Sequence, residues 1–204
     1  ILKPLYAANG LEGSIEMVDF DDDDKLGSGK EKIDLLTNLI AIFENPALNF
    51  KNNRAEDDDI LGDAYEFLMR HFATESGKSK GQFYTPSEVS RILAKVISVE
   101  KADKPSFTVY DPTCGSGSLL LKVVDESKKG LTIYGQEKDI ATKGLAVMNM
   151  WLHGHPEAEI FGKNTIADPQ HKTDGKLKRF DYVVANPPFS VKNWSNGISP
   201  MDDE

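Results

Sequence analysis

The sequence predicts an α/β fold in which a partial, doubly wound parallel sheet of four strands follows an N-terminal helical region. Two observations support this prediction. From residue 107 onward, short runs of β-branched and aromatic residues alternate with amphipathic stretches of helical length, a pattern typical of parallel strands joined by right-handed crossover helices. Before residue 107, the apolar residues recur three and four positions apart, which favours helices alone.

The N-terminal region, residues 1–80, is expected to contain two amphipathic helices after an irregular, acidic start. The first should begin at residue 30 and end at Pro46, because proline cannot continue the helical hydrogen bonding. The second should follow the acidic residues 57–59, which suit the positive end of a helix dipole. We expect both apolar faces to be buried in a core: Ile33, Leu36, Ile40 and Phe43 in the first helix, and Leu61, Tyr65, Leu68, Met69 and Phe72 in the second.

Residues 81–204 are expected to form a second domain, which holds the sheet. A helix should run from Ser87 to about Ser98, with an apolar face made of Val89, Ile92, Leu93 and Val96. The remaining pattern predicts strands at 107–110, 131–135, 159–161 and 180–185, and helices at 118–124 and 140–153.

Charge and composition narrow the class of protein. A free-standing nucleic-acid binder is normally basic, whereas this chain has a formal net charge of -9, so another component must supply most of the affinity if the protein acts on DNA. No apolar run is long enough to span a membrane, and no signal peptide is visible. The single cysteine, Cys114, cannot form an internal disulfide, so we expect a cytoplasmic location. His153 and His155 have no further ligands at metal spacing, and no metal site is expected.

A glycine-rich loop, Asp111-Pro112-Thr113-Cys114-Gly115-Ser116-Gly117, lies between the first predicted strand and the following helix. Glycines let the backbone turn sharply and approach a ligand, while the helix N-terminus offers free N–H groups. Glu137 follows at the end of the next strand, where an acid can accept hydrogen bonds from both hydroxyls of a ribose. The loop lacks the Gly-Lys-Ser/Thr ending of a phosphate-binding loop, which favours a nucleoside ligand without phosphates, such as S-adenosylmethionine.

A second motif, Asn186-Pro187-Pro188-Phe189, follows the fourth predicted strand and should therefore lie at the carboxyl edge of the sheet, where ligands bind. The side-chain oxygen of Asn186 and the carbonyl oxygen of Pro187 could accept both hydrogens of an aromatic amine. This would leave the nitrogen lone pair available to attack a methyl group. Phe189 offers a ring face on which a flipped base can stack.

With Gly81-Gln82-Phe83-Tyr84-Thr85-Pro86 and a helix over residues 60–68 upstream of them, these motifs resemble those of the N6-adenine DNA methyltransferases. The resemblance is specifically to the modification (methylation) subunits of type I restriction–modification systems. It implies the class I S-adenosylmethionine-dependent methyltransferase fold. It also implies site-specific transfer of a methyl group from S-adenosyl-L-methionine to the N6 nitrogen of a flipped adenine in DNA.

The resemblance assigns a role to each residue that matches the family's motifs. The cofactor-binding residues would be Gln82, Phe83, Tyr84, Thr85, Pro86, Ser87, Asp111, Thr113, Cys114, Gly115, Ser116, Gly117, Glu137 and Asp168. Among these, residues 82–87 would close over the methionine end, Glu137 would bind the ribose, and Asp168 would face the adenine ring. The catalytic residues, which would hold the target base, are Asn186, Pro187, Pro188 and Phe189.

The resemblance also implies partners and a continuation of the chain. DNA would be reached through a complex with a specificity subunit, a restriction subunit and a second copy of the modification subunit. Family members continue through further strands after the Asn-Pro-Pro-Phe motif. We therefore expect only the first four strands here, in the spatial order third, second, first, fourth, and we expect the fragment alone to be inactive.

Two other functions remain open. Protein-glutamine N5 methyltransferases also use Asn-Pro-Pro and an aromatic residue to hold a side-chain amide, although residues 82–86 count against this reading. Methyl transfer to a release-factor protein rather than to DNA would distinguish them. The fragment could alternatively be a non-catalytic assembly module that binds cofactor or partner subunits.

Overall fold

The computed structural model describes residues 22–46 and 85–188, together with residues 4, 7–9, 11 and 67. The chain divides into two units, one of residues 16–61 and the other of residues 1–15 and 62–204. The predicted helix over residues 60–68 lies outside the described residues except for one position, and so do Gln82, Phe83, Tyr84 and Phe189. The predicted division into residues 1–80 and 81–204 remains a prediction.

The unit of residues 16–61 contains the first predicted helix. A short helix, α2 (Asp23–Leu26), precedes α3 (Lys30–Phe43), which ends three residues before Pro46. The expected burial of its apolar face is wrong for two of the four residues: Ile33 is 63% exposed and Ile40 is 56% exposed. The described neighbour of α3 within its unit is the four-residue α2, which is too short to cover that face.

The other unit contains a parallel four-stranded sheet, which confirms the predicted α/β class. Its strands are β1 (Thr108–Asp111), β2 (Thr132–Glu137), β3 (Glu159–Gly162) and β6 (Tyr182–Val183). Their spatial order is β3-β2-β1-β6, as predicted. The register pairs Asp111 with Gly135 and Glu137 with Gly162, so the three longer strands end at a common carboxyl edge.

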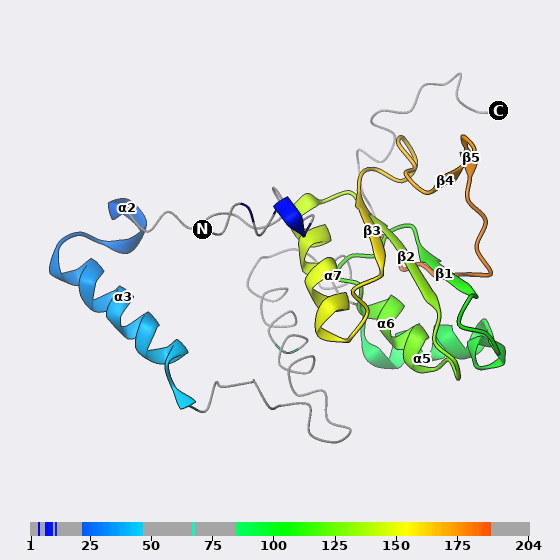
Figure 1. Cartoon of the computed structure of the whole chain (residues 1–204), viewed down its shortest axis with the longest axis horizontal. Coiled ribbons are helices and arrows are strands. Elements are labelled where there is room, and N and C mark those ends of the chain that lie inside the picture. Colours follow the sequence, from blue (N-terminus) through cyan, green and yellow to red (C-terminus); the bar gives the residue numbers. More distant parts are fainter. Residues whose placement is uncertain are drawn as a thin grey trace. The chain divides into compact units, whose positions relative to one another are not determined.

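Helices α5 (Ser87–Val96), α6 (Ser118–Asp125) and α7 (Ile140–Leu152) are associated with this sheet (Figure 1). The chain steps from β1 to β2 through α6 and from β2 to β3 through α7, in the same direction across the sheet. Right-handed crossovers therefore place α6 and α7 on one face. The core between them and the strands includes Leu120, Ile133 and Met150, all fully or almost fully buried.

The apolar face predicted for α5 is only partly correct. Leu93 packs against the core, but Ile92 is 62% exposed and Val96 is 74% exposed. The buried positions of α5 are instead Ser90 and Ala94, one helical turn apart. Small side chains at these positions let α5 approach α6 closely. The buried side of α5 is therefore the one with the smallest side chains and not the one with the most hydrophobic side chains.

Between β3 and β6 the chain forms a hairpin that the sequence analysis did not predict. Strands β4 (Lys172–Thr173) and β5 (Lys176–Leu177) pair antiparallel. The two turn residues, Asp174 and Gly175, have φ values of 52° and 77°. Positive φ at both central residues is the geometry that favours Asp-Gly in two-residue hairpins, so this dipeptide was the available sequence signal.

No helix within the described ranges is both long and apolar enough to cross a membrane.

Candidate functional site at the carboxyl edge of the sheet

The strand order reverses between β1 and β6, and the loops that follow these two strands both contain predicted site residues. From β1 the chain passes through α6 to β2 on one side, whereas β6 returns to pair on the other side of β1. In open α/β sheets, a ligand binds outside the carboxyl ends of the strands at such a reversal. The topology therefore places the glycine-rich loop and the Asn186 motif at one candidate site.

The glycine-rich loop folds back tightly onto the end of β2. The backbone N–H of Cys114 donates to the carbonyl oxygen of Gln136 at 3.1 Å, and the N–H of Gly117 donates to the carbonyl oxygen of Cys114 at 2.8 Å. Gly117 has a φ of 81°, and a Cβ atom there would lie 2.5 Å from the side chain of Met150. The positive φ favours glycine at this position, and any larger residue would also require the Met150 side chain of α7 to move.

Glu137 is held against the glycine-rich loop by a hydrogen bond. One carboxylate oxygen of Glu137 accepts a hydrogen bond of 3.0 Å from the backbone N–H of Gly115, and the other accepts one of 2.8 Å from Asp139. Burial raises the pKa of Glu137, while these backbone hydrogen bonds act in the opposite direction. The carboxylate is thus held in a fixed position beside the loop, and each oxygen retains a lone pair for a further donor.

Asp111 is a second acid at the same loop. Its side chain is almost fully buried, and one oxygen accepts a hydrogen bond of 2.9 Å from the backbone N–H of Thr113. The pKa of Asp111 is raised to about 7, chiefly by burial and to a smaller extent by the charge of Glu137, while the hydrogen bonds from Thr113 act in the opposite direction. Two carboxyl groups with raised pKa values make this a place where a positively charged ligand would be stabilised.

Two other loop residues face the protein interior. Burial, followed by the charges of Asp111 and Glu137, raises the pKa of the Cys114 thiol well above its usual range, which suits an inert side chain rather than a nucleophile. The Ser116 hydroxyl lies 2.9 Å from that of Ser118, and its carbonyl oxygen accepts a hydrogen bond from Asn149. Both residues therefore help to fix the conformation of the loop from its interior side.

Gln136, which was not among the predicted site residues, organises the loop that carries Asp168. Its side chain is completely buried, and its amide nitrogen donates to the carbonyl oxygens of Lys163 at 3.1 Å and Asp168 at 3.0 Å. Its amide oxygen accepts from the backbone N–H of Gln170 at 3.0 Å. A polar residue within an otherwise apolar strand was the available signal, because buried amides need partners.

Asn186 meets a residue from the upstream motif. Its side-chain nitrogen donates a hydrogen bond of 3.3 Å to the hydroxyl oxygen of Thr85, which is itself nearly buried. This contact uses the amide nitrogen, so it does not consume the acceptor capacity of the amide oxygen. Val184, two residues earlier, continues the pairing with β1 by donating to the carbonyl oxygen of Tyr110 at 3.0 Å.

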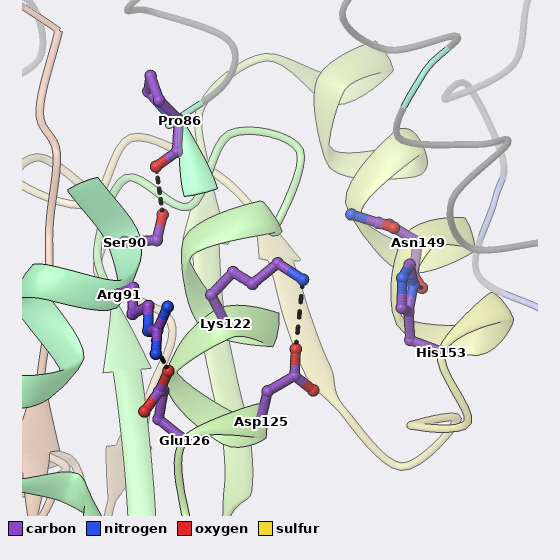
Figure 2. Close-up of polar contacts among 8 residues, drawn as sticks. All are labelled: Pro86, Ser90, Arg91, Lys122, Asp125, Glu126, Asn149 and His153. Carbon is purple, nitrogen blue, oxygen red and sulfur yellow. Dashed lines mark hydrogen bonds and ion pairs between the residues drawn. The ribbon is translucent and has the colours of Figure 1, made fainter. Parts of the chain in front are cut away.

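Some of the predicted site residues do not take part in the contacts described above. Ser87 begins α5 and Pro86 is its N-cap residue, whose carbonyl oxygen accepts a hydrogen bond of 3.2 Å from the hydroxyl of Ser90 (Figure 2). Pro187 and Pro188 are exposed. Within the described residues, no cluster of three or more His, Cys, Asp or Glu side chains could hold a metal ion.

A hollow of about 380 Å³ between α5 and α6 is a poor alternative site. Both cations that line it are paired with carboxylates, Arg91 with Glu126 at 3.1 Å and Lys122 with Asp125 at 3.4 Å (Figure 2). Because these charges are compensated and the glycine-rich loop does not line the hollow, we assign the candidate site to the carboxyl edge.

The amino-acid sequence matches a known family and several known proteins. Residues 56–204 match the N-6 DNA methylase family. The chain is 38% identical over 147 residues to the type I restriction enzyme MpnII methylase subunit of Mycoplasma pneumoniae, a match that covers 67% of this chain and 26% of that protein. It is 33% identical over 217 residues to the MjaVIII methylase subunit of Methanocaldococcus jannaschii, covering 96% of this chain and 35% of the relative.

Solved structures show the same similarity. The methyltransferase subunit of a type I restriction–modification system from Streptococcus thermophilus superposes with a TM-score of 0.72 at 30% identity, covering 90% of this chain and 38% of that one. A class I S-adenosylmethionine-dependent methyltransferase structure from Listeria monocytogenes gives a TM-score of 0.57 at 16% identity, covering 86% of this chain and 53% of that one, which shows the shared fold alone. The chain thus spans between about a quarter and a third of the length of the two curated relatives.

Proposed function

Since this chain belongs to the N-6 DNA methylase family, we propose that it is the part of a type I modification subunit that binds S-adenosyl-L-methionine and the target adenine. The observation that carries the proposal is that two hydrogen-bonded pairs, Glu137 with Gly115 and Asn186 with Thr85, both lie beyond the carboxyl ends of neighbouring strands of the sheet. The first pair would hold the cofactor and the second would hold the base.

The residues at the glycine-rich loop fit S-adenosyl-L-methionine in charge and in hydrogen-bonding capacity. This cofactor carries a sulfonium and an ammonium group, and the loop presents the carboxyl groups of Asp111 and Glu137. Glu137 would accept hydrogen bonds from the ribose hydroxyls, as acids do at the equivalent strand end of nucleoside-binding sheets. Asp168 would accept a hydrogen bond from the adenine amine, on a loop held by Gln136.

Asn186 and Pro187 would prepare the target amine for attack. The lone pair of an exocyclic amine is delocalised into the base, so the amine is a poor nucleophile. If the Asn186 side-chain oxygen and the Pro187 carbonyl oxygen each accept one N–H, the nitrogen becomes more tetrahedral and its lone pair is localised. The cofactor supplies an electrophilic methyl group. In methyl transfer to this nitrogen the cofactor sulfur would be the leaving group, and the amine held by Asn186 and Pro187 would release one of its protons to water.

The whole protein is proposed to act within a complex. The relatives are named as methylase subunits of type I restriction enzymes, and a net charge of -9 gives this chain little electrostatic attraction to DNA. We therefore assign it a specificity subunit, a restriction subunit and a second modification subunit as partners. The single cysteine supports a cytoplasmic location.

The experiment is to locate the transferred methyl group. The full-length protein, assembled with its specificity subunit, is incubated with labelled cofactor, duplex DNA and a release-factor protein. The proposal predicts label on adenine N6 in DNA. Label on a protein glutamine, or binding of cofactor with no transfer to any DNA, would overturn it in favour of a glutamine methyltransferase or a non-catalytic assembly module.

A further inference from the structure

The β4–β5 hairpin and the residues just after it have a net positive charge, whereas the whole chain is acidic. Residues 172–179 contain four basic side chains and one acidic side chain, Asp174, whereas the chain as a whole has a net charge of -9. The basic residues are Lys172, Lys176, Lys178 and Arg179. Basic side chains concentrated on one element of an acidic protein indicate a local contact with a polyanion.

The base of the hairpin is attached at the carboxyl edge of the sheet. Just before β4, the backbone N–H of Gln170 bonds to the Gln136 side chain, and the His171 ring nitrogen Nε2 lies 3.0 Å from the carbonyl oxygen of Gly135. Gly135 and Gln136 directly precede Glu137, the last residue of β2. Figure 1 shows the hairpin projecting at this same edge. It therefore lies on the side of the sheet where the candidate site opens.

The hairpin is fixed to the sheet by aromatic packing. His171 packs against Tyr110, Tyr134 and Phe161, with ring centroids 5.2, 5.3 and 4.8 Å apart. The ammonium group of Lys178 lies 3.7 Å from the centroid of the Tyr134 ring, a cation–π contact. The backbone N–H of Lys178 also donates to the carbonyl oxygen of His171 at 3.0 Å, which closes the base of the hairpin.

Three of the four cations are available for an outside partner. Lys172, Lys176 and Arg179 are exposed, and among the described residues no carboxylate forms an ion pair with any of them. This differs from Arg91 and Lys122 in the hollow between α5 and α6, where each cation has a carboxylate partner.

We propose that Lys172, Lys176 and Arg179 bind backbone phosphates of duplex DNA beside the target adenine. This inference rests on the proposed function and adds to it the surface that contacts the substrate. Phosphate contacts position a duplex without reading its sequence, so the hairpin would align DNA over the site while the specificity subunit reads the bases. Three contacts would leave most of the affinity to other surfaces, as the acidic charge of the chain requires.

The test is the salt dependence of DNA binding by the full-length protein assembled with its specificity subunit. The triple variant Lys172→Gln, Lys176→Gln, Arg179→Gln is compared with wild type between 50 and 200 mM salt. A matched control, Lys101→Gln, Lys128→Gln, Lys129→Gln, removes three exposed lysines before the starts of β1 and β2, at the opposite edge. The slope of log K against log salt is negative, and each lost phosphate contact reduces its magnitude by about 0.9.

We expect the hairpin variant to lose about 2 to 3 units of slope, and the KM for DNA to rise roughly tenfold at the lowest salt. The maximal rate at saturating DNA and the affinity for S-adenosylhomocysteine should be unchanged, which also shows that the loop carrying Asp168 is intact. The variant Lys172→Arg, Lys176→Arg should retain the wild-type slope, because the charges are kept.

A slope equal to that of the control, in an enzyme that methylates DNA normally, would overturn the hairpin assignment and leave the proposed function standing. The hairpin assignment would also be overturned if the variant lost its specificity subunit while the salt dependence of DNA binding stayed unchanged. The hairpin would then be an interface with that subunit. Wild-type protein that transfers no methyl group to DNA would instead overturn the proposed function.

Discussion

The side-chain nitrogen of Asn186 donates a hydrogen bond of 3.3 Å to the hydroxyl oxygen of Thr85, across 101 residues of sequence. Thr85 precedes α5, whereas Asn186 follows β6. Since the bond is made by the amide nitrogen, it orients the amide group and leaves its oxygen to accept a hydrogen from the target amine. Thr85, expected at first only as a cofactor contact, thus also gains a role in positioning Asn186.

Replacing Thr85 by valine should therefore slow methyl transfer. A neutral hydrogen bond contributes about 0.5–1.5 kcal/mol, so the rate constant in a single turnover should fall by roughly 2- to 10-fold. Thr85→Ser keeps the hydroxyl and should restore most of the rate. If valine and serine variants reacted equally fast, the positioning role would be rejected.

Replacing Glu137 by alanine should weaken cofactor binding. The variant loses charge-assisted hydrogen bonds to the ribose and leaves the backbone N–H of Gly115 without its acceptor, a loss of about 1–3 kcal/mol. Titration calorimetry with S-adenosylhomocysteine measures this directly. Glu100→Gln, on the exposed surface, is the control and should bind as wild type does. An unchanged affinity in Glu137→Ala would remove this residue from the site.

The raised pKa of Asp111 predicts a pH dependence of cofactor binding. Burial raises the pKa from the model-compound value of 3.8 to about 7, so the folded protein holds a proton that the unfolded chain has lost between about pH 4 and pH 7. Over that window the contribution of Asp111 to stability falls as the pH rises. A cationic ligand favours the ionised carboxylate, so affinity should increase as the pH rises to about 7 and then level off.

Calorimetry in two buffers of different ionisation enthalpy checks this dependence. Binding at pH 6 should release protons from wild-type protein and fewer from Asp111→Asn. Equal proton release by the two proteins would show that Asp111 does not ionise when the cofactor binds.

Replacing Gln136 by leucine should destabilise the protein and disturb the loop that carries Asp168. The change leaves the carbonyl oxygens of Lys163 and Asp168 and the N–H of Gln170 without their partner, and unmet buried groups cost about 1–3 kcal/mol each. Denaturant unfolding should show a loss of at least that size. Cofactor affinity should also fall in conditions where the variant is folded. A stable variant with normal affinity would contradict the role of Gln136.

Much of the sheet could be predicted from the sequence because short apolar runs and glycine-rich turns are local signals. That Glu137 lies beside the glycine-rich loop could be predicted from their order along the chain. Each follows or ends a strand, and the carboxyl ends of neighbouring parallel strands lie at the same edge of the sheet. The rest depended on tertiary contacts. Which side of α5 is buried is decided by how closely Ser90 and Ala94 let it approach α6. The partner of Asn186 lies 101 residues away, where no local pattern reports it.

The most direct test of the proposed mechanism is single-turnover methylation by Asn186→Ala in the complete complex, with cofactor affinity measured in parallel. Asn186 is expected to touch the target amine and not the cofactor, so transfer to adenine N6 should be abolished while S-adenosylhomocysteine binds within about twofold of wild type. Near-normal transfer by Asn186→Ala would contradict the proposal that this amide prepares the adenine for attack.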